Sequence, residues 1–263
     1  MIRLQLVGGG RMGEALLAGL LRASWAEPGD LAVVERVAAR REQLARSFPG
    51  VAVRAEPVAA QGVVIAVKPS DVLEACKEVA LAGAERVLSI AAGVSTAALE
   101  AALGAGVPVV RAMPNTPAVV GWGAAAIAPG SSAAEADLAW AESILDAVGV
   151  VVRVKEEQLD AVTGLSGSGP AYLFLVAESL IEAGVLVGLP REVAEVLVVQ
   201  TIIGSGQLLR ESDEHAAVLR AAVTSPGGTT AAGLLELELG GVRAAILSAV
   251  RAATERSRQL GSS

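Results

Sequence analysis

The stretch RLQLVGGGRMGEALLAGLLRA, residues 3–23, decides the fold prediction. Its first part, Arg3–Val7, is a short apolar run typical of a buried β-strand, and Met12–Ala23 has the apolar spacing of a helix. Between them, Gly8-Gly9-Gly10-Arg11-Met12-Gly13 has the pattern G-x-G-x-x-G. This pattern, directly after a strand and at the start of a helix, indicates a dinucleotide-binding unit.

The glycines of this turn have separate expected roles. Gly8 permits the tight turn, Gly10 lets a pyrophosphate approach the backbone, and Gly13 allows the helix to pack closely on the strand. The amides at the start of the helix then face the phosphates. We therefore expect Gly8, Gly9, Gly10, Arg11, Met12 and Gly13 to bind the cofactor. The alternative is a glycine-rich turn without a ligand.

Short β-rich runs and helical patterns alternate through the first part of the chain. This alternation predicts a mostly parallel sheet that is covered by helices on both faces. The expected strands are Arg3–Val7, Leu31–Glu35, Val51–Ala55, Gly62–Val67, Val87–Ala91, Val107–Met113, Ala124–Ala128 and Val150–Val154. The expected helices are Met12–Ala23, Val37–Phe48, Ser70–Leu81, Thr96–Leu103 and Glu135–Val148.

From about Leu159 onward the pattern is helical. Gly or Pro separates most of the expected helices, which are Tyr172–Val187, Glu192–Leu209, Ala216–Ala222, Ala231–Leu239 and Val242–Gln259. We predict an α/β, Rossmann-like dinucleotide-binding domain over residues 1–157. An all-α domain for substrate binding and dimerisation is expected over residues 158–263.

Composition excludes several classes of function. The net charge of −7 over 263 residues argues against a nucleic-acid partner. Gly, Pro or a charge interrupts every long apolar run, and the start lacks a signal-peptide pattern, so we expect no membrane span and a cytoplasmic location. One cysteine, Cys76, and one histidine, His215, leave little material for a metal site or a catalytic triad. We expect no metal, and cofactor chemistry instead.

Two signals at the adenosine end of the cofactor disagree. Glu35 ends the second strand, where an acidic residue binds a ribose 2′-hydroxyl and favours NADH. Arg36 follows at once, with Arg40 and Arg41 one turn on. These cations can hold a 2′-phosphate, which favours NADPH, or form an ordinary solvated helix face. We favour NADPH because of Arg36, with NADH as the alternative.

The carboxyl ends of the strands supply further candidates, because ligands bind beyond those ends in parallel sheets. The segment Ala66-Val67-Lys68-Pro69 ends the fourth strand, and we expect Lys68 to stand over the cofactor. Ala91 and Ala92 leave room for a flat ring. Asn115, in a turn with two prolines, is expected to contact the carboxamide or the substrate. The alternatives are a surface role for Lys68 and loop architecture for Asn115.

Two clusters of Gly, Ser and Pro open helices in the second half, at Ser166–Tyr172 and Thr224–Thr230. Successive glycines let backbone amides form an anion-binding concavity at a helix N-terminus, which suits a carboxylate. Each cluster can also be a helix start and nothing more.

Taken together, these motifs resemble one family. The glycine fingerprint is followed, in order, by Val67-Lys68-Pro69, Ala91-Ala92-Gly93-Val94, Arg111–Pro117, Ser166–Tyr172 and Ser225–Thr230. This series resembles the pyrroline-5-carboxylate reductases over essentially the whole chain. The resemblance implies that 1-pyrroline-5-carboxylate is reduced to L-proline with NADPH or NADH, the last step of proline biosynthesis. It also implies a homodimer, often assembled into a decamer of five dimers. Glu35 departs from the small residue common in NADPH-preferring members.

The resemblance implies a substrate site as well. Gly227, Gly228 and Thr229 would give amides to the substrate carboxylate, and Thr230 would be the catalytic contact to the ring nitrogen. Glu156 is a further neighbour of the substrate. A protonated imine is already electrophilic, so the protein mainly has to align it with the nicotinamide.

Two other functions remain open. A related β-hydroxyacid-type dehydrogenase would need a positioned proton donor, and the chain has no lysine after Lys155. A non-catalytic dinucleotide-binding regulator is the second alternative, and the intact Ser225–Thr230 segment argues against it.

Overall fold

The computed structural model describes residues 2–261, which form two compact units. The first unit holds residues 2–168 together with 251–261, and the second holds Gly169–Val250.

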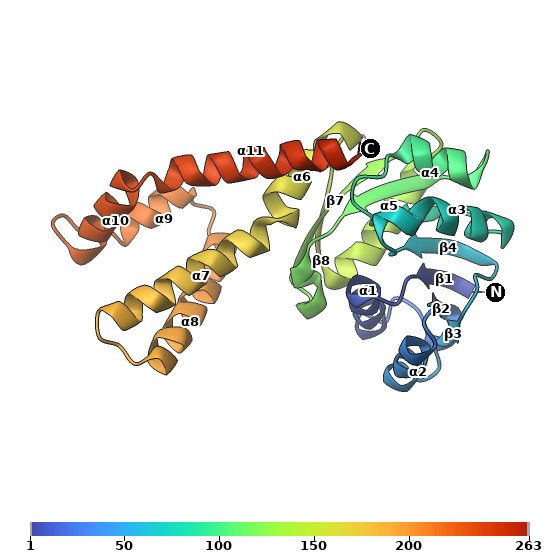
Figure 1. Cartoon of the computed structure of the whole chain (residues 1–263), viewed down its shortest axis with the longest axis horizontal. Helices are drawn as coiled ribbons and strands as arrows, with labels where there is room; N and C mark the ends of the chain where they lie inside the picture. The colour runs from blue at the N-terminus through green and yellow to red at the C-terminus, as the bar shows by residue number, and fades with distance from the viewer. Residues whose placement is uncertain (1, 262–263) are drawn as a thin grey trace. The chain divides into compact units, whose positions relative to one another are not determined.

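The first unit is built on one sheet of eight strands in the order β3-β2-β1-β4-β5-β6-β7-β8 (Figure 1). All neighbouring strands are parallel except β6 and β7. The strands are β1 (Ile2–Val7), β2 (Leu31–Val34), β3 (Ala52–Arg54), β4 (Ala60–Ile65), β5 (Val87–Ser89), β6 (Val109–Met113), β7 (Gly123–Pro129) and β8 (Gly149–Arg153). The predicted Rossmann-like domain with a mostly parallel sheet is confirmed.

Helices cover both faces of this sheet, because alternate strand residues point to opposite sides. One core cluster packs Leu4 and Leu6 of β1 against Leu16 of α1, and the other packs Val63 and Ile65 of β4 against α3 and α4. The helices of this unit are α1 (Arg11–Arg22), α2 (Ala38–Ser47), α3 (Val72–Leu81), α4 (Thr96–Leu103), α5 (Glu135–Leu145) and α6 (Leu159–Val162).

Two strands that lead to the expected site end earlier than predicted. The strand β4 ends at Ile65 rather than Val67, and β5 ends at Ser89 rather than Ala91. Pro69 lacks an amide hydrogen and starts a short 3-10 helix, so the chain leaves the sheet before it. Lys68 and Ala92 therefore lie in loops beyond the sheet edge.

The compact units do not divide the chain where the predicted domains do, at residue 157. The segment after β8 still packs on the sheet, where Leu159 is buried against Ala126 and Ala128. The end of α11 (Val242–Gly261) also belongs to this unit, since Ser257 is buried and its hydroxyl donates to Asp160 at 2.6 Å. The helical sequence pattern thus begins at about Leu159, but the chain still packs in the first unit up to Ser168.

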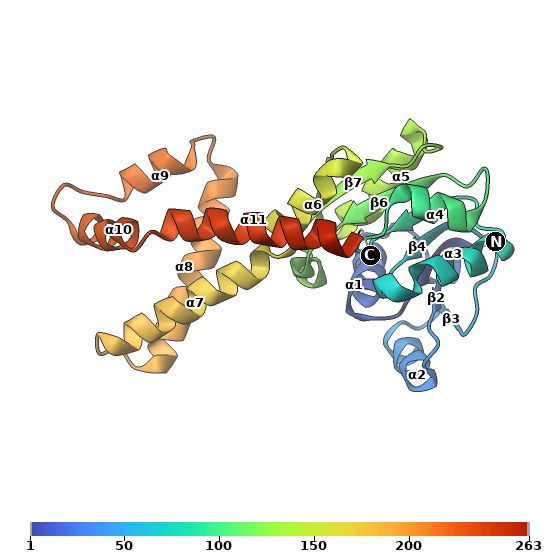
Figure 2. The same ribbon diagram turned by 45° about the horizontal axis from the view of Figure 1, so that its top comes forward.

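The second unit consists of α7 (Gly169–Leu186), α8 (Arg191–Glu211), α9 (Ala216–Ala222), α10 (Thr229–Leu239) and the first part of α11. Figure 2 shows α7 and α8 side by side, joined by a turn at Gly188, whose φ of +101° suits glycine. The helix α10 begins at Thr229, two residues earlier than predicted.

Apolar side chains cover much of the surface of this second unit. Among its described residues, Ala194 is the one buried hydrophobic, whereas Phe174 is 68% exposed and Leu186 is 86% exposed. By length and composition alone, two helical stretches, Glu156–Leu186 and Arg191–Glu211, are apolar enough to cross a membrane. An apolar surface of this extent marks a region of contact with another protein surface or with a membrane.

Candidate cofactor and active site

The turn between β1 and α1 has the geometry that the glycine fingerprint predicts. Gly8 has a φ of +106°, and a Cβ there would lie 2.6 Å from the carbonyl oxygen of Ala66. A Cβ on Gly13 would collide with the carbonyl oxygen of Gly8. Both positions therefore require glycine because any side chain would collide with neighbouring backbone atoms.

Gly10 has no such internal reason to be glycine. Its φ is −69°, and a Cβ built there would meet no described atom within 4 Å. It precedes the first turn of α1, where no side chain caps the free amides. An open, uncapped helix N-terminus without a side chain fits a pyrophosphate that approaches the backbone.

A cavity of about 360 Å³ opens in front of this turn. It brings together predicted cofactor residues from three separate strand ends. Its lining includes Gly8, Gly10, Glu35, Arg36, Val67 and Lys68. Ala66 also lines it, so the turn, the end of β2 and the end of β4 meet at one place.

The remaining residues of the fingerprint do not line this cavity. Gly9 is buried, and its carbonyl accepts a hydrogen bond from Nε of Arg40 at 2.8 Å. Met12 packs against the core, whereas Arg11 is exposed. Arg40, on α2, also pairs with Glu14 on α1, so its side chain contacts the glycine turn and the start of α1 rather than forming part of a solvated face.

Glu35 points into the glycine turn. Its Oε2 accepts from the amide of Gly9 at 3.1 Å, and its Oε1 accepts from the amide of Val37 at 2.9 Å. Each carboxylate oxygen can accept more than one hydrogen bond, so ribose hydroxyls can still be bound. Glu35 is thus fixed at the position expected for a ribose contact.

Arg36, on which the NADPH prediction depends, is held by carboxylates. Its Nη2 lies 2.6 Å from Oε1 of Glu78 and 3.4 Å from Oε1 of Glu74, both on α3. The charges of Glu78 and then Glu74 raise the pKa of the Arg36 guanidinium above its usual value. Sequence reasoning missed Glu78; its signal was an acidic residue one turn after Glu74 on the helix that follows Lys68.

A second cavity, of about 730 Å³, lies beyond the ends of β4 and β5. Pro69, Ala92 and Gly93 line it, together with Arg256 and Leu260 of α11. Two of the predicted cofactor-binding residues, Pro69 and Ala92, therefore share one cavity, whereas Ala91 is buried.

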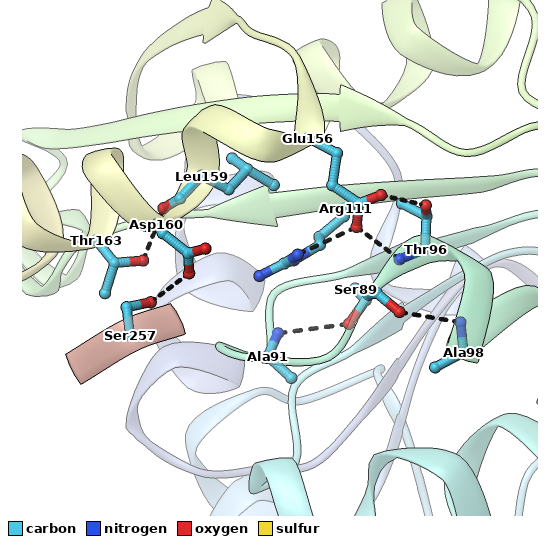
Figure 3. A network of polar contacts seen from close by, with 11 residues as sticks. Ser89, Ala91, Thr96, Ala98, Arg111, Glu156, Leu159, Asp160, Thr163 and Ser257 are labelled. Carbon is cyan, nitrogen blue, oxygen red and sulfur yellow. Dashed lines mark hydrogen bonds and ion pairs between the residues drawn. The ribbon is translucent and has the colours of Figure 1, made fainter. Parts of the chain in front are cut away.

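Glu156 lies in a polar network beside this cavity (Figure 3). Its carboxylate accepts from the amide of Thr96 at 2.6 Å and from the hydroxyl at 2.5 Å, and it pairs with Nη1 of Arg111 at 3.1 Å. Burial alone would raise the pKa of Glu156, but the hydrogen bonds from Thr96 and Arg111 outweigh it and lower the pKa. The structure therefore uses Glu156 to join α4 to β6.

Asn115 is used by the fold itself. Its amide nitrogen donates to the carbonyl of Ser166 at 3.1 Å, and its oxygen accepts from the amide of Ala124 at 2.8 Å. Asn115 is absent from the lining of both cavities, in keeping with the loop-architecture alternative. These bonds use one of the two amide hydrogens of Asn115, and its contact with the carboxamide or the substrate stays a prediction.

The Ser225–Thr230 segment forms the start of α10 in the second unit. Gly227 has a φ of +68°, and Gly228 is the N-cap residue without a side-chain cap. Thr229 and Thr230 occupy the first two helical positions and are exposed. The first amides of α10 are thus available to an anion.

Potential metal ligands do not gather in the structure. Among residues 2–261, no group of three or more His, Cys, Asp and Glu side chains is placed to hold a metal ion. Cys76 is buried in the second core cluster, and burial raises the pKa of its thiol to about 11.

Known proteins are similar to this chain along its whole length. Residues 156–260 match the pyrroline-5-carboxylate reductase dimerisation family, and residues 3–93 match the family described as NADP oxidoreductase coenzyme F420-dependent. A pyrroline-5-carboxylate reductase of Mycobacterium tuberculosis (strain ATCC 25618 / H37Rv) is 46% identical over 287 residues, covering 99% of this chain and 97% of that protein. The chain belongs to the pyrroline-5-carboxylate reductase family.

Solved structures agree with this assignment. A pyrroline-5-carboxylate reductase from Coxiella burnetii has a TM-score of 0.92 at 36% identity and covers 98% of both chains. A pyrroline carboxylate reductase from Plasmodium falciparum, solved with NADP bound, has a TM-score of 0.82 at 32% identity, covering 99% of this chain and 98% of that one. The predicted family and the prediction of an NAD(P)H-dependent oxidoreductase are confirmed.

Proposed function

We propose that this chain reduces 1-pyrroline-5-carboxylate to L-proline by hydride transfer from NADPH or NADH. The observation that carries the proposal is the cavity at Gly10, where the ends of β1, β2 and β4 meet an uncapped helix N-terminus. The chain's membership of the pyrroline-5-carboxylate reductase family supports it. The nicotinamide cofactor, when bound, supplies the hydride. The protein's part is to bind and align both reactants.

The cofactor-binding residues lie in two cavities, one for the pyrophosphate and adenosine ribose and one for the nicotinamide ring. The α1 amides after Gly10 hold the pyrophosphate, and Lys68 supplies a positive charge at the same cavity. Glu35 and Arg36 contact the adenosine ribose end. Ala92, in the second cavity, leaves room for the nicotinamide ring.

The substrate-binding residues come from the start of α10. The amides of Gly227, Gly228 and Thr229 bind the substrate carboxylate at a helix start that no side chain caps. The amide of Gly228 donates to the carbonyl of Ser225 at 3.0 Å, so the carboxylate would share it. The hydroxyl of Thr230 bonds the ring nitrogen. The protonated imine accepts the hydride without a strong general base, which agrees with a chain that has one histidine.

A homodimer covers the apolar helices of the second unit. The match to the dimerisation family over residues 156–260 supports this arrangement, and burial against a second copy accounts for the exposure of α7 and α8 without a membrane. Five such dimers would form the decamer that the sequence resemblance implies. We expect the assembly to work in the cytoplasm.

Oxidation of NADPH and NADH in the presence of 1-pyrroline-5-carboxylate tests the proposal. Cofactor oxidation matched by an equal amount of L-proline supports it. Turnover of a β-hydroxyacid in place of the imine would favour the related dehydrogenase. Cofactor binding without turnover of either substrate would favour a regulator.

A further inference from the structure

We infer that Glu78 on α3 is a determinant of cofactor selectivity, because it holds the guanidinium of Arg36 away from a 2′-phosphate. NADPH and NADH differ only in that phosphate. The inference rests on the proposed cofactor site and assigns to Glu78 a role that the family match does not supply.

The geometry sets up a competition for one cation. Nη2 of Arg36 lies 2.6 Å from Glu78, and Glu74, one helical turn earlier, approaches the same nitrogen at 3.4 Å. Arg36 and Glu78 both line the cavity in front of the glycine turn. A 2′-phosphate bound there must take the guanidinium from two carboxylates.

The neighbouring arginines cannot replace Arg36 in this contact. Nη1 of Arg41 donates to the carbonyls of Glu35 and Arg36, and Nε of Arg40 donates to the carbonyl of Gly9. Contacts with backbone carbonyls therefore hold both side chains, which extend from α2, against the neighbouring loops. Within residues 2–261, the guanidinium of Arg36 is paired only with carboxylate side chains, so its partner can be exchanged.

The charge of the two cofactors decides the direction of the effect. A 2′-phosphate carries negative charge and forms charge-assisted hydrogen bonds with arginine. Glu78 opposes that contact by occupying Arg36. NADH presents a hydroxyl instead, which is bound by Glu35 and has no need of Arg36. Glu78 therefore weakens NADPH binding and leaves NADH binding nearly unchanged.

Titration of the full-length protein with NADPH and with NADH tests this role. Glu78→Gln keeps the size of the side chain but frees Arg36, and we expect the Kd for NADPH to fall about threefold to tenfold, with a change for NADH below about twofold. Glu85→Gln is the matched control, since it removes an equal charge just before β5, at the amino edge of the sheet. The control should leave both Kd values unchanged.

The Arg36→Ala background shows whether Glu78 acts by holding Arg36 or by repelling the 2′-phosphate directly. There, Glu78→Gln should no longer improve NADPH binding. An improvement of equal size in both backgrounds, or an unchanged NADPH-to-NADH ratio in Glu78→Gln alone, would overturn the inference. The readout is binding, so failure to turn over the imine would count against the proposed function alone. If the unmodified protein bound neither NADPH nor NADH, the proposed cofactor site itself would be rejected, and the inference with it.

Discussion

The carboxylate of Glu35 accepts a hydrogen bond from the amide of Gly9 at 3.1 Å, so the acidic residue after β2 is part of the glycine turn. A second bond, from the amide of Val37, fixes its other oxygen. The negative charge of Glu35 therefore stays at the ribose end of the cavity. A 2′-phosphate must approach this charge, whereas a 2′-hydroxyl can donate to it.

Replacement of Glu35 by serine should shift selectivity towards NADPH. Glu35→Ser removes both the repulsion of the phosphate and the acceptor for the ribose. We expect the ratio of kcat/KM for NADPH over NADH to rise about tenfold, which corresponds to about 1.4 kcal/mol. Equal losses for both cofactors would show that Glu35 only supports the turn.

Gly10 and Gly13 allow a paired test of the cofactor site. Gly10→Val places a side chain in open space, so stability should change by no more than about 1 kcal/mol. The Kd for NADPH should rise about tenfold or more, because the side chain stands where the pyrophosphate approaches. An unchanged Kd would show that the glycine turn does not bind the pyrophosphate.

Gly13→Val should behave in the opposite way. Its Cβ collides with the backbone at Gly8, and such overpacking costs about 1–3 kcal/mol of unfolding free energy. Thermal melting compares the two variants directly. Similar melting temperatures would contradict the packing role assigned to Gly13.

The network around Glu156 predicts an acid-dependent loss of stability. Nε of Arg111 is buried without a hydrogen-bond partner among the described residues, so this guanidinium depends on Glu156 for charge compensation. Glu156→Gln should lower the free energy of unfolding at neutral pH by about 1–3 kcal/mol. Glu157→Gln, an exposed neighbour, is the control.

The sign of the pH effect follows from the lowered pKa of Glu156. Its stabilisation is fully present above the unfolded pKa of about 4.3 and is lost as the pH falls through the lower folded value. Denaturant unfolding curves should show the gap between wild type and Glu156→Gln closing below about pH 4. A raised KM for the imine without a stability change would instead support the substrate contact expected from the sequence.

The apolar surface of α7 predicts a specific assembly defect. Phe174→Glu puts a charge on a 68% exposed side chain that we assign to the dimer interface, and it should shift the protein towards monomer in light scattering. Leu81→Glu, on a 91% exposed residue that ends α3, should leave assembly intact. An active wild-type monomer at assay concentration would refute the proposed homodimer.

The alternation of strands and helices was enough to predict the sheet, its eight strands and the helical second half. It was enough as well to gather Gly10, Glu35 and Lys68 at one place, because carboxyl ends of parallel strands meet at one edge. The pattern could not predict which side chains pair with one another around the site. Arg36 and Glu78 are 42 positions apart, and Thr96 and Glu156 are 60 apart, so these contacts depend on how separate elements pack.

The same limit applies to Asn115 and to the end of α11. A side-chain amide in a proline-rich turn has the chemistry of a ligand contact, and only the packed structure shows that Ser166 and Ala124 already use it. The return of residues 251–261 to the first unit also has no local signal, since it depends on contacts between distant segments, such as the hydrogen bond from Ser257 to Asp160.

Thr230 is the residue on which the proposed substrate site depends most. A hydrogen bond to a charged group contributes about 1.5–3 kcal/mol, so Thr230→Ala should reduce kcat/KM for the imine about tenfold to a hundredfold. Thr230→Ser keeps the hydroxyl and should retain much of the activity. NADPH binding should be nearly unchanged in both variants, because Thr230 is assigned to the substrate.

The most direct test is the initial rate of NADPH and NADH oxidation with 1-pyrroline-5-carboxylate, measured for wild type, Thr230→Ala and Thr230→Ser, with melting curves of the same proteins. We expect rapid oxidation by wild type with matching L-proline, most of that rate in the serine variant, and a large loss in a folded alanine variant. No oxidation by wild type would contradict the central claim. A Thr230→Ala protein that melts early but turns over normally would show that the substrate binds elsewhere.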